Sequence, residues 1–99
     1  MVIIKRPMSY RVKNTAQYRR DIKRLKKAGY DLRKIDHVVH NLAARKVLPT
    51  KHKDHSLKGI LVGHRECHIE GDWLLMYRYE QDELVLVLVR SGTHSQLFN

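Results

Sequence analysis

Hydrophobic positions follow two different spacings, which divide the chain into a helical first half and a sheet-forming second half. Tyr18, Ile22 and Leu25 recur at i, i+4 and i+7, the spacing that places one apolar stripe on a helix. A second apolar set recurs at helical spacing within residues 32–42. The sequence therefore predicts two consecutive helices, joined at residues 29–30 as an antiparallel hairpin.

Residues that commonly cap helices mark the ends of these two elements. Asn14 or Thr15 can cap the first helix through a side-chain oxygen, and Gly29 is a natural stop. Asp31 can cap the second helix, which should end near Ala44, ahead of a proline. The boundaries agree with the apolar spacing.

From residue 64 onward the pattern alternates with a period of two, which is typical of β-strands. This alternation should place Glu66, His68 and Glu70 on one face and Cys67 on the other. The β-branched run at residues 84–89 should form the central strand, buried on both faces. Strands are predicted over residues 10–13, 64–70, 73–79 and 84–89.

The remaining segments complete an α+β prediction. Residues 45–63 should form a polar loop, and the tail from Arg90 should form a short strand or loop that brings His94 beside the other strands. We expect a single domain over residues 1–99, with residues 1–9 as a short N-terminal extension. The expected fold is an N-terminal helical hairpin packed on one face of a small, mainly antiparallel sheet.

Basic charge is concentrated in the first part of the chain. Residues 1–58 carry 17 Lys and Arg against 4 Asp and Glu, whereas residues 59–99 carry 3 against 6. A formal net charge of +10 favours phosphate backbones through Coulomb attraction and counterion release. No apolar run approaches the roughly 20 residues of a membrane span, and the start lacks the apolar core of a secretory signal. We expect a cytoplasmic protein that contacts nucleic acid or the ribosome and no membrane.

Three well-separated histidines supply the groups needed to cleave RNA. A 2′-hydroxyl can attack the adjacent phosphorus if a base removes its proton and an acid protonates the departing 5′-oxygen. His55, His68 and His94 can make these transfers near neutral pH. Asp72 can orient or activate a histidine, or take a proton itself. Because the substrate supplies the nucleophile, this chemistry needs no metal and no cofactor.

Cationic and aromatic residues near these histidines can hold the substrate. Lys53, Arg65 and Arg90 can neutralise phosphate. Trp73 and Phe98 can stack on splayed bases, an interaction worth about 1–3 kcal/mol per base. Two structural alternatives remain open on the sequence. Trp73 heads an apolar strand and could be a core residue, and Arg90 could form an ion pair with a nearby glutamate.

Two ligand-like pairs are poorly spaced for a zinc site. His52 and His55 form one pair, and His64 and Cys67 form the other, but the eight connecting residues are fewer than a zinc finger needs. Three residues apart on a predicted strand, His64 and Cys67 should point to opposite faces. We therefore predict no metal site and a buried, apolar role for Cys67, the only cysteine, which also excludes an internal disulfide.

Four segments, taken together and in order, resemble the YafQ branch of the RelE/ParE toxin superfamily. The resemblance covers roughly residues 10–99, and any one segment alone would be weak evidence. The four matching segments are KDHSLKG at residues 53–59, RECHI at 65–69, DWLLMY at 72–77 and RSGTHSQLF at 90–98.

The resemblance implies a toxin of a bacterial type II toxin–antitoxin module, an endoribonuclease that cuts mRNA in the ribosomal A site. It also implies a RelE-like, microbial RNase-like fold, with two N-terminal helices over a curved sheet. The implied partners are mRNA on the ribosome, ribosomal RNA and an acidic cognate antitoxin lying across the basic surface. The positions that match the branch's catalytic residues are His55, His68, Asp72 and His94, and those that match its substrate-positioning aromatics are Trp73 and Phe98.

Other functions remain open on the sequence alone. A ParE-like toxin would share the fold and inhibit DNA gyrase, although gyrase inhibition has no use for proton transfer. A non-catalytic RNA-binding module would use the histidines only as contacts, and a decayed toxin would keep only its antitoxin or DNA-complex roles. For the nuclease we favour His94 as general acid, with His55, or His68 together with Asp72, accepting the 2′-proton.

Overall fold

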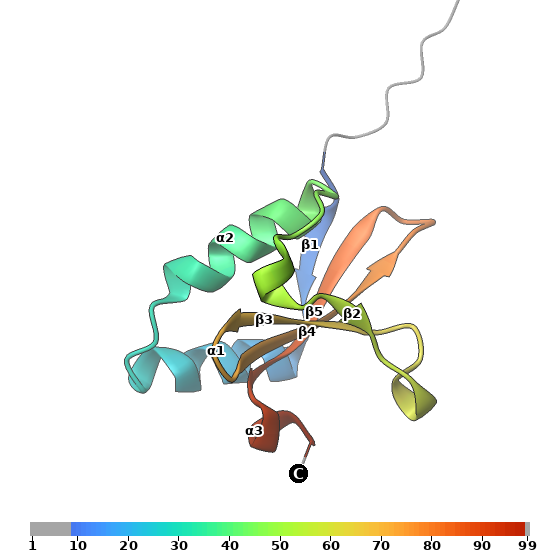
Figure 1. The fold of residues 1–99 in the computed structure, drawn as a ribbon. Coiled ribbons are helices and arrows are strands. Elements are labelled where there is room, and N and C mark those ends of the chain that lie inside the picture. The colour runs from blue at the N-terminus through green and yellow to red at the C-terminus, as the bar shows by residue number, and fades with distance from the viewer. Residues whose placement is uncertain (1–8, 99) are drawn as a thin grey trace, which may run out of the picture.

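A five-stranded sheet in the order β1-β5-β4-β3-β2 organises the fold (Figure 1). This computed structural model describes residues 9–98, so the expected N-terminal extension lies, apart from Ser9, outside the described residues. β1 pairs with β5 in parallel, and the other neighbouring pairs are antiparallel. The sheet is therefore mainly antiparallel, as predicted. Its strands are β1 (Arg11–Asn14), β2 (His55–Ser56), β3 (Arg65–Glu70), β4 (Trp73–Glu80) and β5 (Val85–Thr93).

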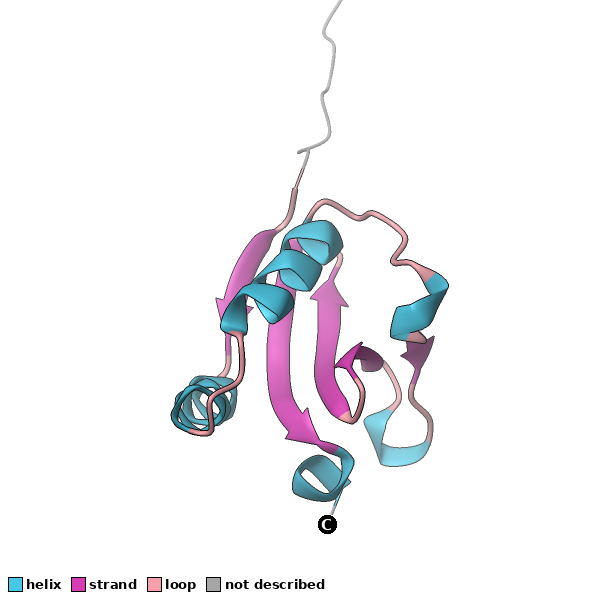
Figure 2. Ribbon diagram, turned by 60° about the vertical axis from the view of Figure 1, so that its left-hand side comes forward, coloured by secondary structure: helices cyan, strands magenta, loops and turns pink. Residues whose placement is uncertain are grey.

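Two helices of 12 residues each follow β1 and begin at the predicted caps. α1 (Ala16–Lys27) begins after Thr15, whose Oγ1 accepts the backbone N–H of Tyr18. α2 (Leu32–Ala43) begins after Asp31, whose carboxylate accepts a backbone N–H of the first turn. Figure 2 shows α1 nearly end-on and α2 from the side, so the two arms of the hairpin are splayed. No helix in residues 9–98 is long and apolar enough to cross a membrane.

The hydrophobic core lies between the two helices and one face of the sheet. α1 contributes Tyr18 and Leu25, and α2 contributes Ile35, Val38 and Leu42. These residues lie at the predicted helical spacing, and burying each large side chain contributes about 1.5–3 kcal/mol. The sheet supplies the opposite layer through Cys67, Ile69, Trp73, Leu75, Tyr77, Leu86 and Leu88.

The face of the sheet away from the helices is termed the outer face. Because Cys67 points into the core, strand alternation turns Glu66 and His68 toward the outer face, as predicted. The pairing of β3 with β4 shifts register between His68 and Glu70. Glu70 instead forms an ion pair with Lys34 of α2. The prediction for Glu70 was therefore wrong, because the irregularity interrupts the alternation.

β5 is an inner strand, but the centre of the sheet is β4. Residues 85–88 are buried, as the β-branched run predicted. β5 continues to Thr93, and the chain then forms the short helix α3 (His94–Phe98), where a strand or loop was expected. The spacing of Thr93 and Gln96 is that of a capping box, a local signal for this helix.

The segment between α2 and β3 contains more structure than the predicted polar loop. It forms two short 3₁₀ helices, η1 (Thr50–His52) and η2 (Gly59–Leu61), with β2 between them. β2 exists because it pairs with β3, a contact that the local pattern of residues 45–63 does not reveal. This pairing places His55 on the edge of the sheet.

Candidate functional site

His55 lies on the edge strand β2, directly opposite Glu66 of β3. Its Nε2 lies 3.7 Å from Oε1 of Glu66, and its Nδ1 lies 2.6 Å from the carbonyl oxygen of Lys53. A carbonyl oxygen can only accept, so Nδ1 carries the hydrogen of that bond. The side chain is 49% exposed, which leaves the ring accessible to a ligand.

Glu66 is a buried acid that was not among the predicted site residues. It is 6% exposed, and its Oε2 has no hydrogen-bond partner within residues 9–98. Burying a carboxylate oxygen without a hydrogen-bond donor costs free energy. Oε2 of Glu66 therefore favours binding a proton, or accepting a hydrogen bond from a hydroxyl group of a ligand. The available signal was the alternation of β3, which places Glu66 on the same face as His68.

His68, Asp72 and His94 gather where the turn between β3 and β4 approaches α3. Nδ1 of His68 donates to the carbonyl oxygen of Gly71 at 3.0 Å, so the lone pair of the neutral ring lies on Nε2 and can accept a proton. Oδ1 of Asp72 accepts the backbone N–H of His94 at 3.3 Å. Asp72 therefore holds His94 through its backbone, rather than by binding an imidazole.

β3 links these two groups of residues. Glu66 and His68 lie two residues apart on one face, which corresponds to about 7 Å along a strand. His55 lies beside Glu66, and the turn that carries Asp72 follows shortly after His68. Backbone neighbours thus connect the three predicted histidines in order, from β2 across β3 to α3, but no hydrogen bond or ion pair joins their rings within residues 9–98. Each is at least partly exposed to solvent.

Two of the predicted substrate contacts are exposed near these histidines. Phe98 is 36% exposed, and its ring centroid lies 4.9 Å from that of His94. Lys53 is exposed and has a left-handed backbone conformation, with φ of 47°, as the chain leaves η1 toward β2. The Phe98 ring can therefore stack on a base, and the Lys53 ammonium group can approach a phosphate.

Trp73 is a core residue in this structure. It is 4% exposed, its Nε1 donates to Oγ of Ser91 at 2.9 Å, and its ring packs edge-on against Tyr30 at 5.0 Å. The indole therefore offers no free face to a base. We correct its predicted role from base stacking to core packing, the alternative that the sequence left open.

Arg65 and Arg90 are held in ion pairs within the protein. The Arg65 guanidinium lies 3.3 Å from Asp54 and donates to Oγ of Ser56 at 2.8 Å. Arg90 donates two hydrogen bonds to Asp21 at 3.1 and 3.2 Å, and not to one of the expected glutamates. Each guanidinium therefore already binds a carboxylate, and each side chain stays partly exposed, so their phosphate contact stays a prediction.

Two further groups near the site, the imidazole of His52 and the thiol of Cys67, are buried. His52 is buried, and its Nδ1 donates to the carbonyl oxygen of His68 at 2.6 Å, which ties η1 to β3. Cys67 is buried as predicted, and burial, together with the charges of Asp54 and Glu66, raises the pKa of its thiol to about 12. Within residues 9–98, no group of three or more His, Cys, Asp or Glu side chains is arranged to hold a metal ion.

Comparison with known proteins places this chain among bacterial toxins. The family described as the bacterial toxin of type II toxin–antitoxin system, YafQ, matches residues 10–99. The mRNA interferase toxin YafQ of Escherichia coli strain K12 is 34% identical over 97 residues, which cover 97% of this chain and 99% of that protein. The sequence similarity therefore extends over nearly the whole length of both proteins.

Solved structures share the fold as well as the sequence. The crystal structure of a metal-bound toxin from Helicobacter pylori is 44% identical, with a TM-score of 0.86, covering 90% of this chain and 99% of that one. A chain of the Escherichia coli DinJ–YafQ toxin–antitoxin complex is 33% identical, with a TM-score of 0.83, covering 92% and 99%. By sequence and by fold, this chain belongs to the YafQ family of bacterial toxins from type II toxin–antitoxin systems.

Proposed function

We propose that this toxin is an endoribonuclease that cleaves mRNA on the ribosome and so stops translation. The observation that carries the proposal is the pair of the exposed His55 and the buried acid Glu66, with two further accessible histidines, His68 on β3 and His94 at the start of α3. Relatives that are 34% and 32% identical bear the name mRNA interferase toxin, which supports the same reaction class. The proposed reaction requires no cofactor from the protein.

His68 is the best-placed base for the 2′-hydroxyl. Its Nδ1 hydrogen is committed to the Gly71 carbonyl, so the neutral ring presents the Nε2 lone pair. His55 differs because its Nε2 faces Glu66, and a proton on Nε2 would place an N–H between the imidazole and the carboxylate. A cationic His55 would stabilise negative charge on the nonbridging phosphate oxygens. The alternative, in which His55 takes the 2′-proton, requires that ring to be neutral.

His94 is the proposed general acid. It is the first residue of α3 and is exposed, and Asp72 accepts its backbone N–H. In the reaction, the 2′-oxygen forms a bond to phosphorus while the bond from phosphorus to the 5′-oxygen breaks. His94 gives its proton to the departing 5′-oxygen, which leaves a 2′,3′-cyclic phosphate and a 5′-hydroxyl end. Loss of one general acid should slow cleavage about 10²–10⁴-fold.

The proposed partners follow from the exposed charges. Phe98 would stack on a base and Lys53 would contact a phosphate of the message. The basic face of α1 would dock on ribosomal RNA in the cytoplasm, and an acidic antitoxin would neutralise the toxin, as the DinJ–YafQ complex of the relative suggests. The exposed cations of that face are Arg19, Arg20, Lys23, Lys26 and Lys27.

Mapping of 5′ ends after induction tests the proposal. Two matched messages are compared, one translated and one whose start codon has been removed, with His94→Ala as the inactive control. We expect new 5′ ends in register with codons on the translated message only. Equal cutting of both messages would contradict ribosome dependence. Arrest of DNA synthesis before protein synthesis, without new 5′ ends, would favour gyrase inhibition.

A further inference from the structure

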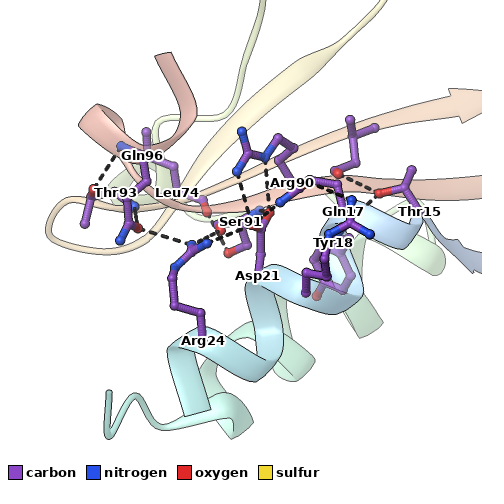
Figure 3. Close-up of polar contacts among 12 residues, drawn as sticks. Thr15, Gln17, Tyr18, Asp21, Arg24, Leu74, Arg90, Ser91, Thr93 and Gln96 are labelled. Atoms are coloured by element: carbon purple, nitrogen blue, oxygen red, sulfur yellow. Dashed lines mark hydrogen bonds and ion pairs between the residues drawn. The ribbon is translucent and has the colours of Figure 1, made fainter. Parts of the chain in front are cut away.

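A buried acid fixes the C-terminal segment to α1 (Figure 3). The Asp21 side chain is 0% exposed and accepts hydrogen bonds from Arg90 and from the backbone N–H of Ser91 at 3.0 Å. Arg24, one turn along α1, donates to Asp21 at 2.9 Å. Burial opposes ionisation of Asp21, but bonds from Arg90, Ser91, Gln17 and Arg24 outweigh it and lower the pKa of this carboxyl. Asp21 is therefore a stable anion on which the network is built.

Arg24 extends this network to α3. Its Nη2 donates to the carbonyl oxygen of Ser91 at 3.0 Å and to Oε1 of Gln96 at 3.2 Å (Figure 3). The same Oε1 accepts the backbone N–H of Thr93 at 2.8 Å, and Oγ1 of Thr93 accepts the backbone N–H of Gln96 at 3.3 Å. A reciprocal capping box thus fixes the first turn of α3 locally, and Arg24 fixes it to α1.

The contact between Arg24 and Gln96, termed the brace, depends on a close approach at Gly92. A Cβ atom at Gly92 would lie 2.6 Å from Oε1 of Gln96 and 2.7 Å from Nη2 of Arg24. The side chains of Arg24 and Gln96 therefore occupy the space that any side chain at position 92 would need. Little apolar packing holds this helix in place, because none of the five residues of α3 is buried and Leu97 is only half-buried.

We propose that Arg24 and Gln96 are positioning residues, which hold α3 so that His94 meets the departing 5′-oxygen. This inference rests on the proposed role of His94. His94 lies between the two members of the capping box, so any rotation of the first turn moves its imidazole. A misplacement of about 1 Å can cost about 10²-fold in rate. The brace therefore acts on cleavage through geometry, without touching the substrate.

Three variants of α3 isolate this role. Gln96→Leu removes the amide oxygen that accepts from both Arg24 and Thr93, whereas Gln96→Glu supplies carboxylate oxygens that can accept from both donors. Ser95→Ala, an exposed neighbour in the same turn, is the matched control. Single-turnover cleavage of ribosome-bound mRNA and thermal unfolding are measured for each. We expect Gln96→Leu to lower the rate about 10- to 100-fold at saturating ribosome complex, with unchanged KM and unfolding temperature. Gln96→Glu and Ser95→Ala should cleave like the wild type.

A double variant tests the link to α1. Because Arg24→Leu also breaks the bond to Asp21, it should lower stability as well as rate. If the two side chains act as one brace, Arg24→Leu/Gln96→Leu should be no slower than the slower single variant. Additive losses, or wild-type cleavage by Gln96→Leu, would overturn the proposal.

The His94→Ala variant in the same assay distinguishes a failure of the proposed acid role of His94 from a failure of the brace. A fully active His94→Ala protein would disprove the proposed role of His94, and with it the positioning role of Arg24 and Gln96. If His94→Ala is inactive and Gln96→Leu is fully active, the role of His94 stands and only the positioning role of the brace is disproved. The amide order parameters of His94 and Phe98 provide a second readout, which should fall in Gln96→Leu and remain unchanged in Ser95→Ala.

Discussion

Nε2 of His55 faces Oε1 of Glu66 across 3.7 Å, between an edge strand and its neighbour. The other carboxylate oxygen of Glu66 is buried and has no hydrogen-bond partner in the described part of the chain. Burial of an incompletely paired charge does not serve stability. A buried carboxylate can, however, stabilise a cationic imidazole that lies near a phosphate. We therefore propose that Glu66 contributes to function at some cost to the stability of the fold.

The first prediction concerns Glu66→Gln, which keeps the shape of the side chain and removes its charge. Cleavage should fall about 10²-fold because the negative charge beside His55 is lost. The free energy of unfolding should stay constant or rise by about 1 kcal/mol, because a buried charge is removed. Single-turnover cleavage and urea denaturation measure the two effects. A variant with lower stability and normal cleavage would show that Glu66 is only structural.

The second prediction distinguishes a core role for Trp73 from a substrate-binding role for Phe98. Trp73→Leu should destabilise the fold by about 2–4 kcal/mol, because it removes a large core side chain and its bond to Ser91. Phe98→Leu should change stability by less than about 0.5 kcal/mol and lower cleavage about 10-fold through lost base stacking. Chemical denaturation and cleavage rates test the pair. Equal losses of stability in both variants would contradict this division.

The third prediction concerns Asp21, whose pKa is lowered in the folded state. Asp21→Asn leaves Arg90 and Arg24 without their anion and should cost about 3 kcal/mol at pH 7. Because the folded pKa lies below the ordinary value of 3.8, this stabilisation is complete above that value and is lost as the pH falls through the folded pKa. Urea denaturation at pH 7 and pH 3 should show the difference between wild type and variant shrinking at acid pH. An equal difference at both pH values would contradict the assignment.

The fourth prediction concerns the Cys67 thiol, whose pKa burial raises from 9.0 to about 12. At pH 8 the thiolate fraction should be about 10³-fold lower than for the unperturbed thiol, and the side chain is also inaccessible. Native protein should therefore react with a thiol reagent only after unfolding. Labelling with and without denaturant measures this. Rapid stoichiometric labelling of the native protein would contradict a purely structural role.

Local signals in the sequence were enough for the elements whose determinants are neighbours in the chain. The caps Thr15 and Asp31 and the apolar stripes predicted both helices, because a helix end is satisfied within one turn. Alternation predicted that Glu66 and His68 share a face of β3. These positions required no knowledge of distant contacts.

Residues whose partners lie far away in the chain were predicted less well. Arg90 binds Asp21, which lies 69 residues earlier, so its sequence neighbours suggested the wrong partners. Trp73 begins a strand, yet contacts from Tyr30 and Ser91 bury it. The polar segment that carries β2 gave no strand signal, because pairing with β3 creates that strand. Such contacts decide whether a cation or an aromatic ring remains free for a substrate.

The most direct test of the account uses purified ribosomes carrying a defined message in the A site. Single-turnover cleavage is compared for the wild type and His94→Ala, with circular dichroism and antitoxin binding as controls for folding. The account predicts that His94→Ala folds and binds antitoxin normally but cleaves about 10²–10⁴-fold more slowly, while the wild type leaves 2′,3′-cyclic phosphate ends. Cleavage by His94→Ala at the wild-type rate would contradict acid–base catalysis by this histidine.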